Sequence, residues 1–234
     1  MDLLNTEIRQ ATRKKFDEEM TGRVTLLHFT QEPGRLVLPD SLKGQECMFC
    51  RETKQLLEEV SGLSDKVELQ IFDFTADKDK AAEFGIDKIP ALVLKGEKDY
   101  GLRFFGIPSG YEYSSLIEAM VDVSRGETSL SAKTKEALHA LDTSIHLQVF
   151  VTPTCPYCSI SVRLAHQFAL ESPLIRADMV EATEFPHLSN RFNVMGVPKT
   201  VINETAFIEG ALPEDRFLDE VLKAVQPPDI PSAK

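Results

Sequence analysis

Two spacings of apolar residues alternate along the first half of the chain. Among the charged residues of 5–20 the apolar positions recur at helical intervals, which predicts an amphipathic helix. The run 24–29 that follows is almost continuously apolar, as in a buried strand. The further elements expected in this half are a helix from Cys47 with Leu56, Leu57, Val60 and Leu63 on one face, a strand at 67–71, a short helix at 78–84, strands at 91–94 and 102–105, and a helix at 112–123. Helices and strands that alternate in this way predict an α/β fold.

The second half repeats the same order. Its expected elements are a helix at 133–141, a strand at 147–151, a helix from Cys155 to about Leu170, strands at 175–180, 199–202 and 206–208, and a helix at 214–225. Asn203-Glu204 predicts a tight turn between the last two strands. The sequence therefore predicts two tandem domains, residues 1–124 and 125–234, each a central mixed β-sheet flanked by helices. The connection near 124–127 is short, so we expect the domains to pack together.

Cysteines and prolines give this repeat a fixed spacing. The four cysteines form two C-x-x-C pairs, Cys47-Met48-Phe49-Cys50 and Cys155-Pro156-Tyr157-Cys158, and the second pair begins 108 residues after the first. A proline, Pro90 or Pro198, follows the first cysteine of each pair by 43 residues. The chain is thus interpreted as an internal duplication of a dithiol unit.

Composition narrows the class of protein. A content of 42% hydrophobic and 27% charged residues is typical of a globular protein with two modest cores. The net charge of −11 argues against binding to nucleic acid or anionic membranes, because such proteins carry a basic face. Residues 1–7 lack the apolar core of a signal peptide, so the expected location is the cytoplasm. Structural disulfides are rare there, and a C-x-x-C pair beside a strand is then interpreted as redox-active or metal-binding.

The C-x-x-C spacing at a helix start assigns different roles to the two cysteines. Unpaired N–H groups and the helix dipole stabilise a thiolate at the helix N-terminus. Cys47 and Cys155 are therefore the predicted nucleophiles. Cys50 and Cys158, expected one turn further into the helix, are predicted to be less exposed and to resolve the mixed disulfide with substrate.

Residues around each dithiol are predicted to bind substrate. Ile89-Pro90 and Val197-Pro198 both precede a strand, where we expect cis peptide bonds that expose a backbone edge to an extended client segment. Apolar side chains next to the dithiols are expected to form a patch for unfolded clients. The predicted substrate-binding residues are Ile89, Pro90, Val197, Pro198, Met48, Phe49, Pro156 and Tyr157.

Together these features resemble the thioredoxin and glutaredoxin family. The order of strand, C-x-x-C helix, strand, Ile/Val-Pro, hairpin and last helix is similar to that fold, and Cys155-Pro156-Tyr157-Cys158 is similar to the glutaredoxin active-site tetrapeptide. Two such units in one chain resemble the protein disulfide oxidoreductases of thermophilic archaea and bacteria. The segments that carry this closer likeness are 122–125, 150–158 and 193–199.

The resemblance implies a fold and a function. It implies two thioredoxin-like domains and reduction, oxidation and isomerisation of protein disulfides at two sites. It also implies protein clients as substrates, electrons from a thioredoxin-reductase-like flavoprotein, and no bound organic cofactor. Contents of four Asn and eight Gln agree with a thermophilic source.

The two sites differ in sequence. Met48-Phe49 is bulkier than Pro156-Tyr157, and a longer loop, 31–46, precedes the first site. Next to Cys47, Glu46 opposes thiolate formation and Arg51 favours it, whereas the second site has neutral neighbours. Our hypothesis is that the C-terminal site is the faster or more oxidising one. The proline-rich end 226–234 is not expected to be helical.

Several alternatives stay open. Paired C-x-x-C motifs also form structural zinc sites, although 104 residues between the pairs is far more than zinc ribbons use. Asp73 and Glu181 correspond in the repeat and could accept a proton from the resolving cysteines, or could simply be solvated. The five histidines show no ligand spacing and are interpreted as surface or packing residues. Other possible functions are an electron shuttle from a flavoprotein reductase to a peroxidase, and a redox-insensitive client-binding scaffold.

Overall fold

The computed structural model describes residues 3–31 and 47–225. The first half holds α1 (Thr6–Glu19), β1 (Val24–Thr30), α2 (Cys50–Ser61), β2 (Val67–Asp73), α3 (Lys78–Glu83), β3 (Ala91–Lys95), β4 (Asp99–Phe105) and α4 (Glu112–Arg125). The second half holds α5 (Ala132–His139), β5 (Ile145–Val151), α6 (Cys158–Glu171), β6 (Ile175–Glu181), α7 (Pro186–Arg191), β7 (Lys199–Ile202), β8 (Ala206–Glu209) and α8 (Glu214–Val225). The predicted long loop before Cys47 and the predicted non-helical tail lie mostly or wholly outside the described residues.

Most predicted elements are present, with two differences. The sequence pattern missed α7, a helix of six residues with Pro186 in its first turn and no buried residue, so it offers no apolar stripe. Both dithiol helices begin at the second cysteine instead of the first, because the two residues between the cysteines form a turn. The expectation that Cys50 and Cys158 lie one turn into their helices is therefore wrong; they are the first helical residues.

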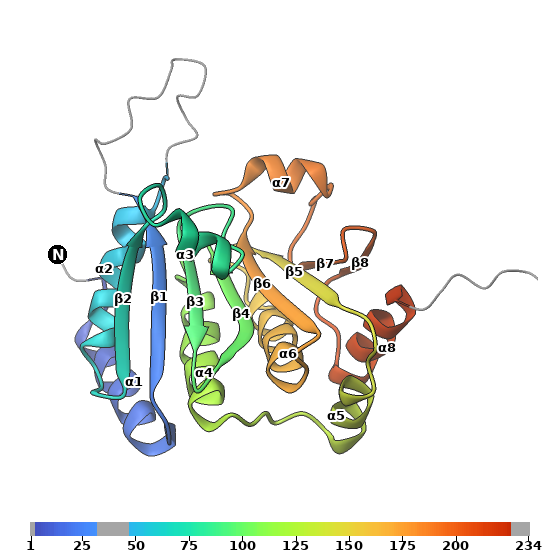
Figure 1. The fold of residues 1–234 in the computed structure, drawn as a ribbon, viewed down its shortest axis with the longest axis horizontal. Helices are drawn as coiled ribbons and strands as arrows, with labels where there is room; N and C mark the ends of the chain where they lie inside the picture. The colour runs from blue at the N-terminus through green and yellow to red at the C-terminus, as the bar shows by residue number, and fades with distance from the viewer. Residues whose placement is uncertain (1–2, 32–46, 226–234) are drawn as a thin grey trace, which may run out of the picture.

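All eight strands form one continuous sheet in the order β2-β1-β3-β4-β6-β5-β7-β8. Figure 1 shows the first half of the sheet joined side by side to the second. Both halves have the same internal order, and β4 and β6 join them as parallel neighbours. The expectation that the halves pack together is confirmed. The proposed division at residue 124 falls at the end of α4, where Gly126 is the left-handed C-cap.

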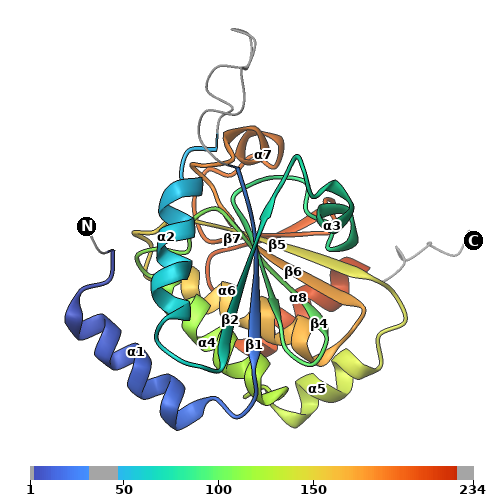
Figure 2. The same cartoon turned by 60° about the vertical axis from the view of Figure 1, so that its left-hand side comes forward.

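The sheet is covered unequally on its two faces. On one face, a large core cluster joins the sheet to α1, α2, α4, α5, α6 and α8 through side chains such as Phe16, Leu57, Met120, Phe168 and Phe217. On the other face a smaller cluster includes Ala81 of α3 and Phe185, the N-cap of α7. Figure 2 shows α2 and α3 on opposite sides of the sheet.

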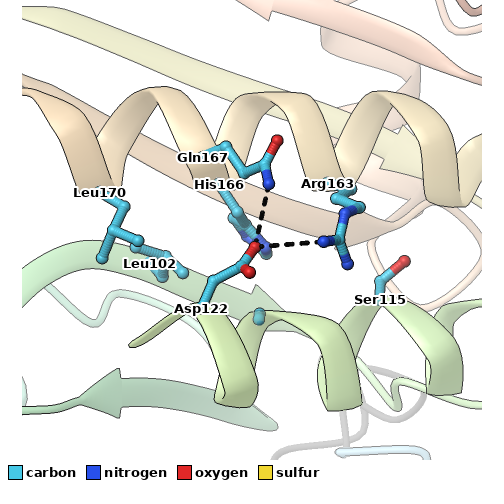
Figure 3. A pocket seen from close by; sticks show the side chains of 8 residues that line it. Leu102, Ser115, Asp122, Arg163, His166, Gln167 and Leu170 are labelled. Atoms are coloured by element: carbon cyan, nitrogen blue, oxygen red, sulfur yellow. Dashed lines mark hydrogen bonds and ion pairs between the residues drawn. The ribbon is translucent and has the colours of Figure 1, made fainter. Parts of the chain in front are cut away.

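Helices α4 and α6 pack against each other across the junction of the halves. Asp122 of α4 accepts a hydrogen bond from Gln167 Nε2 at 3.1 Å and lies 3.5 Å from the Arg163 guanidinium, both on α6 (Figure 3). Beneath them, the buried His166 ring stands edge-on to Phe104 of β4. The junction thus combines backbone pairing in the sheet with polar and aromatic contacts between helices. Within residues 3–31 and 47–225, the helices are all too short or too polar to cross a bilayer.

Candidate active sites

The two dithiols follow strands whose carboxyl ends lie at the same end of the sheet. Strand β1 is antiparallel to β3, β3 is antiparallel to β4, and β4, β6 and β5 are mutually parallel neighbours. Hence β1 and β5 run in the same direction, and the chain reaches each dithiol after the carboxyl end of one of these strands. The strand ladders also repeat: Val24 pairs with Val67, and Ile145 pairs with Ile175, at the start of β1 and β5.

In the first site, Cys47 and Cys50 form a disulfide. Cys47 is half-buried, whereas Cys50 is buried at the start of α2. Between them, the Met48 side chain is 64% exposed, and Phe49 is the N-cap whose carbonyl accepts a hydrogen bond from the Thr53 N–H. The outer sulfur is thus the one a substrate can reach.

In the second site, Cys155 and Cys158 are free thiols. Cys155 is half-buried and its Sγ lies 3.6 Å from the carbonyl oxygen of Val197. Cys158 is fully buried at the start of α6. The expected difference in exposure between the outer and inner cysteines is therefore confirmed in both sites.

Both prolines have the predicted conformation. The Ile89-Pro90 and Val197-Pro198 peptide bonds are cis. The carbonyl of Pro90 accepts a hydrogen bond from the N–H of Gly106, and that of Pro198 accepts one from the N–H of Gly210. The two glycines, both at positive φ, thus occupy equivalent places in the repeat.

The buried thiol of Cys158 has a raised pKa. Burial is the largest cause, because it disfavours the thiolate. The neighbouring Cys155 sulfur and the Glu112 carboxylate also raise this pKa, while the backbone of Thr152 acts in the opposite direction. Cys158 therefore needs a proton acceptor before it can act as a nucleophile.

Glu112 is a buried carboxyl group that the other half of the chain supplies to the second site. It is the first residue of α4; its Oε2 accepts a hydrogen bond from Ser115 at 2.7 Å, and its Oε1 is buried without a partner among the described residues. Burial raises the pKa of Glu112 to about 7. Repeat logic missed this residue, because Gly106 corresponds to Gly210, 104 residues later, and the residue 104 positions after Glu112 is the exposed Arg216 of α8.

The loop between β4 and α4 holds Glu112 against the second site. The N–H of Tyr111 donates to the carbonyl of Pro153, two residues before Cys155. The N–H of Ile107 donates to Glu184 Oε1 at 2.6 Å, just beyond β6. A loop of the first half is thus hydrogen-bonded to the second half near both of its ends.

The two carboxyl groups predicted from the repeat have local partners. Asp73 Oδ1 accepts hydrogen bonds from the N–H groups of Thr75 and Ala76 and forms a turn after β2. Glu181 is buried, and its Oε2 accepts hydrogen bonds from the Thr183 hydroxyl and the Glu184 N–H. Their role in proton transfer stays a prediction.

Exposed apolar side chains surround the second dithiol in sequence and structure. Tyr157 lies within the motif, and Ile160 follows it on α6. Met195, which is 86% exposed, precedes Val197 by two residues, and Tyr111 is carried by the loop bound to Pro153. In the described part of the chain, no three His, Cys, Asp or Glu side chains are grouped as a metal ion would require.

Known proteins are similar to this chain in sequence and in fold. The model of the thioredoxin domain family matches residues 145–223. A solved protein disulfide oxidoreductase from Aeropyrum pernix is 31% identical, with a TM-score of 0.84 over 96% of this chain and 94% of that chain. This chain belongs to the thioredoxin-fold disulfide oxidoreductases.

A second group of similar proteins has a longer chain. The alkyl hydroperoxide reductase protein AhpF of Pseudomonas aeruginosa is 26% identical over 171 residues, which is 73% of this chain and 31% of the relative. This chain thus spans about a third of the length of the curated relatives it matches. A solved domain of AhpF from Enterococcus faecalis is 28% identical, with a TM-score of 0.80 over 95% of this chain and 100% of that chain.

Proposed function

We propose that the chain reduces, oxidises and isomerises disulfides of protein clients at two dithiol sites. The observation that carries this proposal is the same arrangement in both halves: a half-buried cysteine, a buried cysteine at a helix start, and a cis-proline turn. The accessible sulfur can attack a client disulfide, and the buried sulfur can attack the resulting mixed disulfide and release the client. The likeness to the Aeropyrum pernix oxidoreductase supports the same function.

In the reductive direction, the Cys155 thiolate attacks one client sulfur. A Cys155–client disulfide forms, and the other client sulfur leaves as a thiolate that takes a proton from solvent. Cys158 then loses its proton and attacks the Cys155 sulfur, which forms the Cys155–Cys158 disulfide and frees the second client thiol. The reverse sequence oxidises a client, and release before Cys158 attacks allows isomerisation.

Glu112 is the proposed proton acceptor for Cys158. Its carboxylate lies close enough to act on the pKa of this thiol, and its own raised pKa brings the two groups nearer in proton affinity. The residues proposed to hold an extended client segment are those predicted above, and the Val197 carbonyl beside Cys155 Sγ supports this at the second site. The proposed electron donor is a thioredoxin-reductase-like flavoprotein, and no bound organic cofactor takes part.

Trapping of the mixed disulfide tests this function. In a chain with Cys47→Ser and Cys50→Ser, the further change Cys158→Ser should leave Cys155 able to attack but unable to release. With insulin as the probe, we expect an insulin-linked species on non-reducing gels and a loss of insulin reduction. Cys155→Ser in the same background should give no insulin-linked species, although it should also abolish insulin reduction. Insulin reduction by the wild-type chain no faster than by a chain that lacks all four cysteines, with equal client binding by both, would contradict the proposal and favour a client-binding scaffold.

The likeness to AhpF supports a second candidate function, an electron shuttle between a flavoprotein reductase and a peroxidase. A shuttle would serve few clients. Recovery of activity from scrambled ribonuclease separates the two, because an isomerase restores it and a dedicated shuttle does not.

A further inference from the structure

Each dithiol helix carries a buried hydroxyl group three residues after its inner cysteine. Thr53 follows Cys50 on α2, and Ser161 follows Cys158 on α6. The two hydroxyl positions are 108 residues apart, as the two C-x-x-C pairs are. The residues on either side of them are charged in the first half and apolar in the second. The halves thus share a hydroxyl at a place where its neighbours in sequence differ.

Both hydroxyl groups lack a hydrogen-bond partner. Thr53 Oγ1 and Ser161 Oγ are buried, and neither bonds to another atom of the described residues. A Ser or Thr within a helix often donates to the carbonyl three or four positions earlier, but these two do not. Folds normally avoid unpaired buried polar atoms, and a redox or catalytic role is one reason to keep them. Packing alone would be served equally by Val or Ala.

Helix geometry places each hydroxyl next to the inner sulfur. Residues three apart lie on the same face of a helix, with Cβ atoms about 5–6 Å apart. Helical side chains also lean towards the N-terminus, over the residue three or four positions earlier. Thr53 and Ser161 therefore lean over Cys50 and Cys158. The exposed fraction of these four residues is 3% or less, so each pair lies on the core-facing side of its helix.

The charge on the inner sulfur changes during disulfide exchange. At rest Cys50 is in a disulfide, and Cys158 is a thiol whose pKa is raised by burial. Uncharged sulfur accepts hydrogen bonds only weakly. The inner sulfur becomes negative when it attacks a mixed disulfide, or when it leaves as an outside thiol attacks the outer cysteine. A buried hydroxyl stabilises this charge, because hydrogen bonds to ionised groups are stronger than those to neutral ones.

We propose that the hydroxyl groups of Thr53 and Ser161 donate a hydrogen bond to the inner sulfur of their site while that sulfur is negatively charged. This inference rests on the proposed function. The inner thiol first gives its proton to a base, Glu112 at the second site and hydroxide from solvent at the first. The inner thiolate attacks the outer sulfur, the bond from the outer sulfur to the client breaks, and the client thiolate takes a proton from solvent. The hydroxyl keeps its own proton throughout.

Removal of one hydroxyl at a time tests this inference, with each site as the control for the other. Thr53→Val and Ser161→Ala remove the hydroxyl, whereas Thr53→Ser and Ser161→Thr keep it. Each site is measured in a chain whose other two cysteines are serine. In the reaction with 5,5′-dithiobis(2-nitrobenzoate), the first equivalent of released thionitrobenzoate reports attack by the outer cysteine, and the second reports attack by the inner one.

The expected change is confined to the second phase. Loss of a hydrogen bond to a charged group raises the pKa of the inner thiol by about one unit or more, and roughly half of this change appears in the rate. Thr53→Val should therefore slow the second phase at the first site at least threefold at pH 7, and Ser161→Ala should do so at the second site. The first phase and the other site should stay unchanged, which also shows that the variants fold.

Reduction of each disulfide by dithiothreitol separates this role from packing. It should slow by the same factor as the second phase, so the equilibrium constant with dithiothreitol should stay within twofold, because the hydrogen bond acts only on the charged sulfur. A second phase within 1.5-fold of the parent would overturn the inference for that site. So would equal slowing by Thr53→Ser or Ser161→Thr, or an equilibrium constant that changes as much as the rate. Loss of both phases in the parent chains would instead overturn the proposed function.

Discussion

Individual residues make the two dithiols chemically different although the backbone around them repeats. The second site has the Glu112 carboxyl beside Cys158, and the first half has the buried His28 imidazole on β1, the strand that leads to its dithiol. Both groups are buried, but burial shifts their pKa values in opposite directions, because it disfavours an anion in one and a cation in the other. The sites should therefore respond differently to pH.

Glu112→Gln should change both stability and rate. The raised pKa of Glu112 means that the folded state holds this proton while the unfolded state releases it above about pH 4.5. Wild-type stability should therefore fall relative to the variant as the pH rises from 5 to 8, by on the order of 2–3 kcal/mol. Urea unfolding at both pH values measures this, and Glu220→Gln is the control. If Glu112 accepts the proton of Cys158, the variant should also resolve mixed disulfides at least tenfold more slowly.

Among the elements, the β4–α4 loop links the first half to the second active site. Gly110 lies in this loop at φ +61°, and a Cβ atom there would stand 2.1 Å from the carbonyl oxygen of Pro153. The loop and the segment before Cys155 thus approach so closely that only glycine fits. The same loop leads directly into α4 and Glu112.

Gly110→Ala should push this loop away from the second site. Gly210→Ala is a matched control, because Gly210 also has positive φ but has open space around its Cβ position. The control should lose about 1–2 kcal/mol from the left-handed conformation alone. We expect a larger loss for Gly110→Ala and a slower second site with an unaffected first site, measured by urea unfolding and nitrobenzoate release. Equal losses in the two variants would contradict the contact.

The elements also show what the sequence could and could not predict. The helix α8 has the bounds that its apolar spacing predicted, because one face of it packs on the core. The α7 helix has no buried face and gave no signal. Glu112 and His28 escaped detection because each depends on contacts with other elements, and the equivalent place in the other half has a different kind of residue, Arg216 or Val149. Pairing of β4 with β6 is likewise a property of two edges that no local pattern reveals.

At the scale of the whole molecule, the continuous sheet joins the two halves more firmly than a linker would. Backbone hydrogen bonds between β4 and β6 cross the junction, and α4 packs on α6 above them. Separation of the halves would expose an unpaired strand edge on each. The two halves should therefore unfold together.

Thiol labelling can follow each half during unfolding. In a chain with Cys47→Ser and Cys155→Ser, the buried Cys50 and Cys158 report on the first and second halves. Labelled peptides should appear with the same urea midpoint for both cysteines, as in a two-state transition. Two separated midpoints would show that each half is stable alone.

The junction between the halves pairs two different strand edges, one from each half, so the same kind of contact can be repeated. Strand β6 is the repeat counterpart of β2, and β8 is the counterpart of β4, so the outer strands present the same two edges that meet at the centre. A head-to-tail contact of this type could in principle continue from molecule to molecule as a filament. Two features oppose it: β8 has four residues where β4 has seven, and β2 exposes Glu68 and Gln70. The outer edges therefore no longer match each other as β4 and β6 do at the centre.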